Sequence, residues 1–248
     1  MSKVYLTGSS GFIGSNMVKY LAGKGNEVLS FKRPIDEAFW KIKVDQSFEF
    51  IHLSAYGNHN SQRDLAKTLR ANISDLLHIT TFLSGIATCS KLYNISTSSI
   101  QLPKQTLYSA SKHLGELMVE SYNDPRFVNV RPYSVYGPGE ADHRFIPTVI
   151  RALHSGETIQ LDEHASHDWI YVDDFIKAMF DGYTNIGTGK SYTNLDIVWM
   201  LEHISGKKLN YQPAKMRSYD TANWVCPDGV PHRDIMEGLK LTYESFTR

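Results

Sequence analysis

Cysteine is scarce in this chain of 248 residues, which contains only Cys89 and Cys226. Two cysteines cannot build the disulfide framework of a small secreted domain, and their separation matches no metal-binding motif. We therefore expect packing thiols in a reducing compartment and no metal site.

The chain also carries no net charge. The 26 lysines and arginines balance 26 aspartates and glutamates, so the formal net charge at pH 7 is zero. Such a chain has no general electrostatic attraction for nucleic acid or for an anionic membrane.

No apolar run approaches the roughly 20 residues of a membrane span, and a strand predicted from residue 3 leaves no room for a signal or transit peptide. The sequence thus predicts a cytoplasmic protein that binds neither nucleic acid nor membrane.

Three glycines close to the start of the chain form its most informative motif. The run GSSGFIG at residues 8–14 places Gly8, Gly11 and Gly14 between an apolar strand and a predicted helix over residues 12–21. Glycines let the backbone turn tightly and approach a pyrophosphate, while the helix offers N–H groups and the positive end of its dipole. A glycine triad also occurs in ordinary turns, but the strand before it and the helix after it favour a dinucleotide. Phe12 and Ile13, in the first turn of that helix, join the glycines as cofactor-binding candidates.

Strand-like and helix-like segments alternate through the first half of the chain. After the first strand and helix, the predicted strands are residues 27–31, 48–53, 92–95 and 127–130, and the predicted helices are 61–87 and 108–122. This alternation is typical of a parallel sheet covered on both faces, with ligands at the carboxyl ends of the strands. Beyond Pro132 the elements become irregular, with helices expected at 145–153, 174–180 and 195–204 and strands at 169–172 and 209–211. We expect an α/β fold, with a Rossmann-type doubly wound parallel sheet (1–135 and about 168–185) and a small C-terminal α/β substrate lobe (136–167 and about 186–248).

The residues after the second strand bear on the choice of cofactor. Folds that prefer NAD generally present an acidic residue here to bind the ribose 2′-hydroxyl, whereas this chain has Lys32 and Arg33. These cations would favour a 2′-phosphate, although a solvated basic turn would have the same composition. The sequence therefore predicts NADP in preference to NAD.

Tyr108 and Lys112 are the strongest catalytic candidates. Four residues apart on a helix, they share one face. The same spacing occurs at Tyr20 and Lys24 and again at Tyr211 and Lys215, but only Tyr108 and Lys112 start a helix shortly after a strand that ends in hydroxyl residues. An exposed tyrosine beside a solvated lysine is the alternative reading.

The chemistry of this pair explains why these residue types would be used. Free tyrosine titrates near ~10, and a neighbouring ammonium together with a positive nicotinamide ring would favour tyrosinate. Tyr108 could then exchange a proton with a sugar hydroxyl or carbonyl while the nicotinamide exchanges a hydride. Thr97 would hydrogen-bond the same oxygen, and Ser96, Ser98 and Ser99 are alternatives for that role.

The chain resembles the extended short-chain dehydrogenase/reductase superfamily, in particular the NAD-dependent epimerase/dehydratase family that acts mostly on nucleotide sugars. The motifs that carry the resemblance run nearly from end to end: GSSGFIG at 8–14, HLSA at 52–55, Ser96-Thr97 before Tyr108 and Lys112, RPYSVYGP at 131–138, DWIYVDD at 168–174, NIGTG at 185–189 and the pair Arg217 and Asp220. The resemblance implies that Thr97 polarises the substrate and that Leu53, Ser54 and Ala55 line the cofactor beside the glycines. It also implies that Arg217 and Asp220 contact the nucleotide diphosphate and ribose, with a surface ion pair as the alternative. By the same resemblance, a homodimer forms through the helices at 61–87 and 108–122.

Departures from the family pattern narrow the expected reaction. Dehydratases of the family carry Asp-Glu directly after the catalytic threonine, where this chain has Ser98 and Ser99, so elimination lacks an evident acid and base. An arginine that often precedes the DWIYV-type motif is His167 here, which weakens the expectation of ordinary diphosphate binding. We predict a nucleotide-sugar epimerase working by transient oxidation to a keto-sugar. The alternatives are an NADPH-dependent reductase of a nucleotide-linked ketosugar and a non-catalytic cofactor-binding scaffold or sensor.

Overall fold

The chain divides into two compact units, residues 1–132 and 133–248. The structure is a computed structural model, and it describes residues 2–31, 39, 41–42, 45–59, 61–103, 105–214 and 224–246. Within these ranges, no helix is both long enough and apolar enough to cross a membrane. The finer division predicted from the sequence, in which residues 168–185 return to the dinucleotide domain, stays a prediction.

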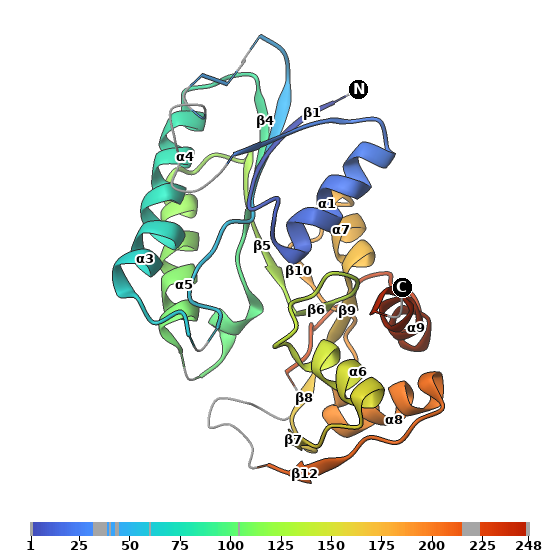
Figure 1. Cartoon of the computed structure of the whole chain (residues 1–248). Helices are drawn as coiled ribbons and strands as arrows, with labels where there is room; N and C mark the ends of the chain where they lie inside the picture. The colour runs from blue at the N-terminus through green and yellow to red at the C-terminus, as the bar shows by residue number, and fades with distance from the viewer. Residues whose placement is uncertain are drawn as a thin grey trace. The chain divides into compact units, whose positions relative to one another are not determined.

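The first unit is built on a parallel sheet (Figure 1). Its strands are β1 (Lys3–Thr7), β2 (Glu27–Phe31), β3 (Phe48–His52), β4 (Cys89–Ile95) and β5 (Phe127–Pro132). They lie in the order β5-β4-β3-β1-β2, and every neighbouring pair is parallel. The chain moves outward from β1 to β2 and then crosses back to β3 on the other side of β1. That reversal creates the switch point at which open α/β sheets bind ligands, at the carboxyl ends of β1 and β3.

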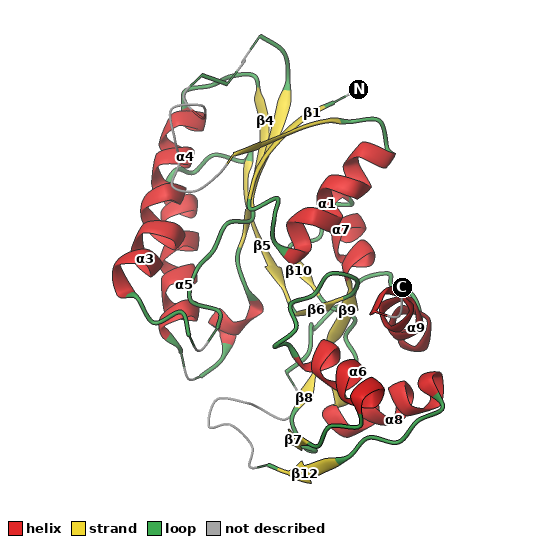
Figure 2. Ribbon diagram, in the orientation of Figure 1, coloured by secondary structure: helices red, strands yellow, loops and turns green. Residues whose placement is uncertain are grey.

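Helices cover both faces of this sheet, as Figure 2 shows. Helix α1 (Phe12–Gly23) lies on one face, while α3 (Leu65–Leu69), α4 (Asp75–Ser84) and α5 (Leu107–Ser121) lie on the other. A short 3₁₀ segment, η2 (Ser98–Gln101), follows β4. The predicted α/β fold with a doubly wound parallel sheet is therefore confirmed.

One predicted helix of this unit differs from the observed structure. Instead of a single helix over residues 61–87, α3 begins at Leu65, a turn of π-helix (η1, Arg70–Ser74) follows, and α4 ends at Ser84. The start is fixed by Asp64, whose side chain accepts a hydrogen bond from the Lys67 N–H at 3.0 Å. Apolar spacing alone gave neither this N-cap nor the π-helical turn.

An aromatic core packs on strands β1 and β3. Tyr5, Phe48, Phe39 and Phe50 are at most 2% exposed, and their rings meet edge-on, with the Tyr5 and Phe48 centroids 5.1 Å apart. Edge-to-face pairs of this kind add to the free energy gained by burying the rings. Cys89 lies in the same core, where burial raises the pKa of its thiol to about 11. Cys89 therefore packs as part of this core.

The second unit consists of helices and short strands. Its helices are α6 (Phe145–Ser155), α7 (Val172–Phe180), α8 (Asn194–Ser205) and α9 (Ile235–Phe246), and its strands are β6 (Ser134–Tyr136), β7 (Ile159–Leu161), β8 (Ser166–His167), β9 (Trp169–Tyr171), β10 (Asn185–Ile186), β11 (Tyr192–Thr193) and β12 (Tyr211–Pro213). Strand β6 pairs with β9 and β7 with β12 in parallel, whereas β8 and β11 pair antiparallel. The predicted α/β lobe is thus present, but the sequence did not predict β6, β7, β8, β10, β11 or α9. Helix α9 carries Gly238 mid-helix, where a Cβ would collide with the Tyr136 hydroxyl, so packing rather than helix propensity specifies it.

Candidate active site

The glycine turn after β1 is shaped by the close approach of the backbone. Gly8 has a φ of +77°, and a Cβ there would lie 2.9 Å from the Ser54 nitrogen. A Cβ on Gly14 would collide with the carbonyl oxygen of Gly8. Larger residues at either position would force the turn, helix α1 and the loop after β3 apart. Glycine is therefore required at both positions for steric reasons.

The start of α1 is open to an anionic ligand. Gly11 is its N-cap and provides no side-chain cap, and the first turn of the helix contains no acidic residue. Gly11 itself donates its N–H to the Gly8 carbonyl at 3.1 Å. The N–H groups that begin a helix have no partner within it, so those of Phe12 and Ile13 can bind an anion. The residues present fit the pyrophosphate of a dinucleotide.

The strand ends on either side of the switch point are joined by side chains. Thr7 Oγ1 lies 3.0 Å from His52 Nδ1, and the Ser54 N–H donates to the same hydroxyl at 3.3 Å. Ser54 is buried, while Leu53 and Ala55 are half-buried beside it. These contacts bring the predicted cofactor residues of the two strands together, because Gly8 packs directly on Leu53 and Ser54. Lys32 and Arg33, on which the NADP prediction rests, lie outside the described residues.

The hydroxyl-rich run after β4 separates into different roles. Thr97 is the N-cap of η2, and its Oγ1 accepts from the Ser99 N–H at 3.2 Å and lies 2.9 Å from Ser99 Oγ. Ser98 is buried and donates to the Pro132 carbonyl at 2.7 Å, which commits it to the fold. Ser96 is buried too, at 3% exposure. Thr97 and Ser99 are left as the partly accessible hydroxyls.

Tyr108 and Lys112 lie in the first two turns of α5. Thr106 and Ser109 form a capping box that fixes where this helix begins. Tyr108 is half-buried, whereas Lys112 is only 1% exposed. Burying a lysine is costly unless other groups compensate for its charge, so its retention indicates a specific role. Gly57, in the loop that continues from Ala55, lies against the start of α5, where its Cβ would be 3.7 Å from the Tyr108 Cβ.

A buried asparagine that the sequence did not single out links these parts. Asn72 accepts from the Tyr56 N–H at 2.9 Å and donates to the Tyr56 carbonyl and to Ser111 Oγ, both at 2.8 Å. Ser111 in turn donates to the Tyr108 carbonyl at 2.8 Å. Asn72 lies in the π-helical turn, a distortion that is frequent at functional sites. Asn72 thereby joins the loop after β3 to helix α5. One signal for it in the sequence was a polar residue on the apolar face of the predicted helix.

Helix α5 is held against strand β5 by a partly buried ion pair. The Arg131 guanidinium contacts both oxygens of Glu116, with distances from 2.6 to 3.1 Å, and Glu116 is 1% exposed. Bidentate pairs of this type fix orientation as well as distance. The neighbouring residue, Gly115, lets α5 approach the π-helical turn, because a Cβ there would lie 3.0 Å from the Asn72 carbonyl oxygen. The position of Tyr108 is thus set by contacts on two sides of its helix.

The second unit contains a carboxylate with several donors. Asp168 is 1% exposed and accepts from the Thr188 N–H and hydroxyl, the Gly189 N–H and the Cys226 N–H, at 2.6 to 2.9 Å. It fixes the loop after β10 to the segment that begins at residue 224. Arg217 and Asp220, the predicted substrate contacts, lie outside the described residues.

A model of the NAD dependent epimerase/dehydratase family matches residues 4–193. The chain belongs to this family. CDP-abequose synthase of Salmonella muenchen is 26% identical to it over 250 residues, which cover 87% of this chain and 85% of that protein. GDP-6-deoxy-D-talose 4-dehydrogenase of Aggregatibacter actinomycetemcomitans is 27% identical over 236 residues, covering 82% and 80%. The solved structure described as MoeE5 in complex with UDP-glucose and NAD matches the fold with a TM-score of 0.83 and 21% identity, over 99% of both chains.

The predicted family membership is confirmed by this match, and so is the assignment to NAD(P)-dependent enzymes of the extended short-chain dehydrogenase/reductase type. The roles of Thr97, Tyr108 and Lys112 stay predictions, as do those of the cofactor-binding and substrate-binding residues.

Proposed function

We propose that this enzyme transfers a hydride at a carbon of a nucleotide-linked sugar, with Tyr108 exchanging the accompanying proton. One observation carries the proposal. In the first unit, the glycine turn packs on Leu53 and Ser54, and the same loop continues through Gly57 to the start of the Tyr108 helix. A dinucleotide bound at the turn would therefore lie along a loop that ends beside Tyr108.

Each of the three candidate residues, Tyr108, Lys112 and Thr97, has its own role in the proposed reaction. A bound nicotinamide would supply or accept the hydride. In the oxidising direction, Tyr108 in its phenolate form takes the proton of a sugar hydroxyl, and in the reducing direction it returns that proton to the carbonyl oxygen. Lys112 lies one turn further along the same face, where its ammonium favours the phenolate and can contact the cofactor ribose. Thr97 donates a hydrogen bond to the reacting oxygen and holds it in line.

Elimination of water is not part of this proposal. Ser98 occupies one of the two positions where the resemblance places the dehydratase acid and base, and its hydroxyl is already bonded to the Pro132 carbonyl. Ser99 is engaged with Thr97. A serine hydroxyl is a poor general acid or base without an activating partner.

Two outcomes of hydride transfer remain, and we place the epimerase first. In that reaction the keto-sugar turns within the site and the hydride returns to its other face, so the cofactor is not consumed. The second candidate is one-way reduction of a nucleotide-linked ketosugar. It is favoured by the relative named as a 4-dehydrogenase, whose match covers 82% of this chain.

A single assay separates these outcomes. The purified enzyme is incubated with a panel of nucleotide sugars and nucleotide ketosugars, with NADP(H) or NAD(H), and both sugar products and cofactor absorbance are followed. Epimerisation predicts a change of sugar configuration with no net change in cofactor, whereas reduction predicts one reduced cofactor consumed for each product. Binding of cofactor and nucleotide sugars without turnover of any of them would support the scaffold instead and overturn the proposal.

We also propose an isologous homodimer through α3, α4 and α5. Leucines on these helices are 39 to 53% exposed: Leu65, Leu69, Leu77, Leu107, Leu114 and Leu117. An apolar surface of this kind on adjacent helices is typical of an interface between protein chains. The dimer is tested by light scattering, in which Leu114→Glu with Leu117→Glu would halve the measured mass. A monomeric mass for the parent chain at micromolar concentration would contradict it.

A further inference from the structure

A histidine that takes no part in the proposed reaction is fully buried at the end of β3. His52 pairs in register with Thr7 of β1 and with Asn94 of β4, and all three residues are 0% exposed. Paired residues of neighbouring strands point to the same face of the sheet. Two positions earlier on β3, that face carries Phe50 of the aromatic core. A polar row thus begins where the aromatic core ends, and burying polar groups is costly unless their hydrogen bonds are made.

The Thr7 hydroxyl decides which nitrogen of His52 carries the proton. Thr7 Oγ1 accepts a hydrogen bond from the Ser54 N–H at 3.3 Å and lies 3.0 Å from His52 Nδ1. A backbone N–H can only donate, so among the described residues His52 Nδ1 is the acceptor left for the hydroxyl proton. A neutral imidazole that accepts at Nδ1 carries its proton on Nε2. The two contacts of Thr7 therefore determine the tautomer of His52.

The Ser54 amide connects Thr7 and His52 to the glycine turn. A Cβ on Gly8 would lie 2.9 Å from the Ser54 nitrogen and 3.0 Å from the Leu53 carbonyl carbon, so the turn packs on the peptide group between these two residues. The Thr7 hydroxyl holds the N–H of the same peptide group. Contact between the turn and the loop after β3 thus depends on the direction in which the Thr7 hydroxyl points, and His52 sets that direction.

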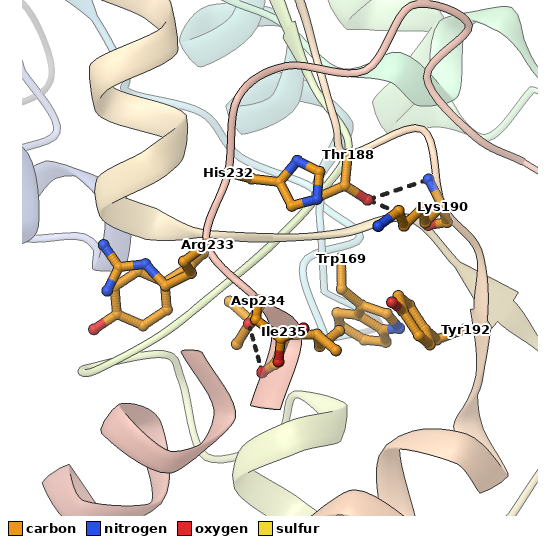
Figure 3. A pocket seen from close by; sticks show the side chains of 10 residues that line it. Trp169, Thr188, Lys190, Tyr192, His232, Arg233, Asp234 and Ile235 are labelled. Atoms are coloured by element: carbon orange, nitrogen blue, oxygen red, sulfur yellow. Dashed lines mark hydrogen bonds between the residues drawn. The ribbon is translucent and has the colours of Figure 1, made fainter. Parts of the chain in front are cut away.

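A threonine of the second unit has the same pattern of hydrogen bonds. Thr188 Oγ1 accepts from the Lys190 N–H at 3.2 Å (Figure 3) and donates to Asp168 Oδ1 at 2.7 Å. In both units a side-chain acceptor takes the hydroxyl proton and leaves a lone pair for a backbone N–H. Thr188 follows β10, whereas Thr7 holds the loop that packs on the glycine turn. The two threonines therefore form a matched pair of the same chemistry in different places.

We propose that His52 is a positioning residue for the dinucleotide. Its Nδ1 accepts the Thr7 hydroxyl proton, Thr7 in turn holds the Ser54 N–H, and the loop of residues 53–55 is thereby kept against the glycine turn before the cofactor binds. A loop that is already ordered loses less conformational entropy on binding, so this arrangement raises the affinity without touching the ligand. The inference rests on the proposed function for the identity of that ligand, a dinucleotide cofactor.

Two substitutions at Thr7 test the hydroxyl in the intact chain. Thr7→Val removes it at nearly unchanged volume, whereas Thr7→Ser retains it. Titration of NADP and NAD against protein fluorescence should give dissociation constants about fivefold higher for Thr7→Val, the usual net contribution of one hydrogen bond, and within about twofold of the parent for Thr7→Ser. Thr188→Val removes the corresponding hydroxyl of the second unit and should leave these dissociation constants unchanged, even where it lowers the urea midpoint.

The ring nitrogens of His52 provide a readout that does not involve the cofactor. The chain has ten histidines. A ¹H–¹⁵N correlation spectrum of labelled protein at neutral pH distinguishes protonated from unprotonated ring nitrogens, and His52→Asn identifies the signals of His52. We expect its proton on Nε2. His52→Asn keeps an acceptor, the amide oxygen, near the place of Nδ1, so it should bind the cofactor more tightly than His52→Leu, which leaves the Thr7 proton without an acceptor.

The outcomes distinguish this inference from the proposed function. A proton on Nδ1, equal affinities of Thr7→Val and the parent, or an equal loss in Thr7→Val and Thr188→Val would overturn the role of His52, even in an enzyme that turned over nucleotide sugars. If Thr7→Val does not fold, equal affinities of His52→Asn and His52→Leu would overturn it instead. A selective loss in Thr7→Val, in a protein that bound cofactor but turned over no sugar, would uphold the positioning role and refute the proposed function. Failure of the parent to bind either dinucleotide would overturn both.

Discussion

The two units assemble their functional residues in different ways. In the first unit, the candidate residues follow the strands at fixed short distances, Gly8 after β1, Ser54 after β3 and Thr97 after β4. The parallel sheet brings these strand ends together, so position in the sequence is nearly enough to place them. In the second unit, Asp168 joins Thr188 and Cys226, which are 20 and 58 residues further along the chain. The arrangement of these loops in the second unit therefore depends on individual long-range hydrogen bonds.

The two units also differ in the groups that compensate the charge of their buried carboxylates. Glu116 of the first unit is held at both oxygens by Arg131. Glu140 of the second unit is also buried, but its nearest cation, Arg144, lies 3.6 Å away, and Oε2 has no hydrogen-bond partner among the described residues. Asp168 relies on N–H and O–H donors rather than on a cation. The second unit should therefore respond more strongly to changes in single charged residues.

Asp168→Ala should produce the largest loss of stability. It leaves three backbone N–H groups without their acceptor, and unsatisfied buried donors cost 1–3 kcal/mol each, so we expect a loss of about 4 kcal/mol. Urea unfolding of the variant measures it. The control is Asp181→Ala, because Asp181 is 47% exposed and its ion pair with Lys177 contributes less than about 1 kcal/mol. Equal effects of the two substitutions would contradict the role of Asp168.

Tyr108→Phe should produce the largest loss of activity while preserving the fold. Loss of the exchangeable proton should lower kcat by at least about 100-fold, with little change in the urea midpoint. Lys112→Met should weaken cofactor binding more than Tyr108→Phe does. Because the residues act together, the double variant should be scarcely worse than the poorer single variant. A folded, cofactor-loaded Tyr108→Phe enzyme that works at the parent rate would refute the assignment.

The strand–glycine–helix motif and the alternation of elements were enough to predict the sheet of the first unit. The π-helical turn and Asn72 were not predicted, because the Asn72 contacts join segments 16 and 39 residues apart and no local pattern encodes them. Helix α9 was missed for a related reason. Gly238 weakens its helix signal, and the tolerance for glycine comes from Tyr136, about a hundred residues away. Sequence patterns thus predicted what periodicity encodes and missed what long-range packing decides.

Glu140→Gln should change how stability depends on pH. Burial raises the pKa of Glu140 from 4.5 to about 7 in the folded chain, with Arg144 only partly opposing the rise. Between these values the folded state binds more protons than the unfolded state, so this group's contribution to stability falls as pH rises from about 4.5 through 7. Glu140→Gln should remove that fall, and the parent should lose about 2 kcal/mol relative to it between pH 5 and 8. Urea unfolding at both pH values measures the difference.

The matched control lies in the first unit. Glu116→Gln breaks the bidentate contact with Arg131 and should destabilise the chain at pH 8, the opposite of Glu140→Gln. If both substitutions destabilised the chain equally at pH 8, the two buried carboxylates would not differ in how their charge is compensated.

The smallest expected effect concerns the choice of cofactor, which the first unit alone should decide. In the sequence Lys32 comes directly after β2, and in dinucleotide-binding folds the residue that follows this strand reaches the 2′ position of the adenosine ribose. A lysine attracts a 2′-phosphate, and an aspartate repels it while accepting a hydrogen bond from a 2′-hydroxyl. Lys32→Asp should therefore shift the ratio of the NADP and NAD dissociation constants toward NAD by roughly tenfold or more, the equivalent of about 1.4 kcal/mol. Titration of both cofactors against protein fluorescence measures the ratio, with Lys207→Asp in the second unit as the control for net charge. Comparable dissociation constants for the two cofactors in the parent enzyme, or an unchanged ratio in Lys32→Asp, would refute the NADP preference.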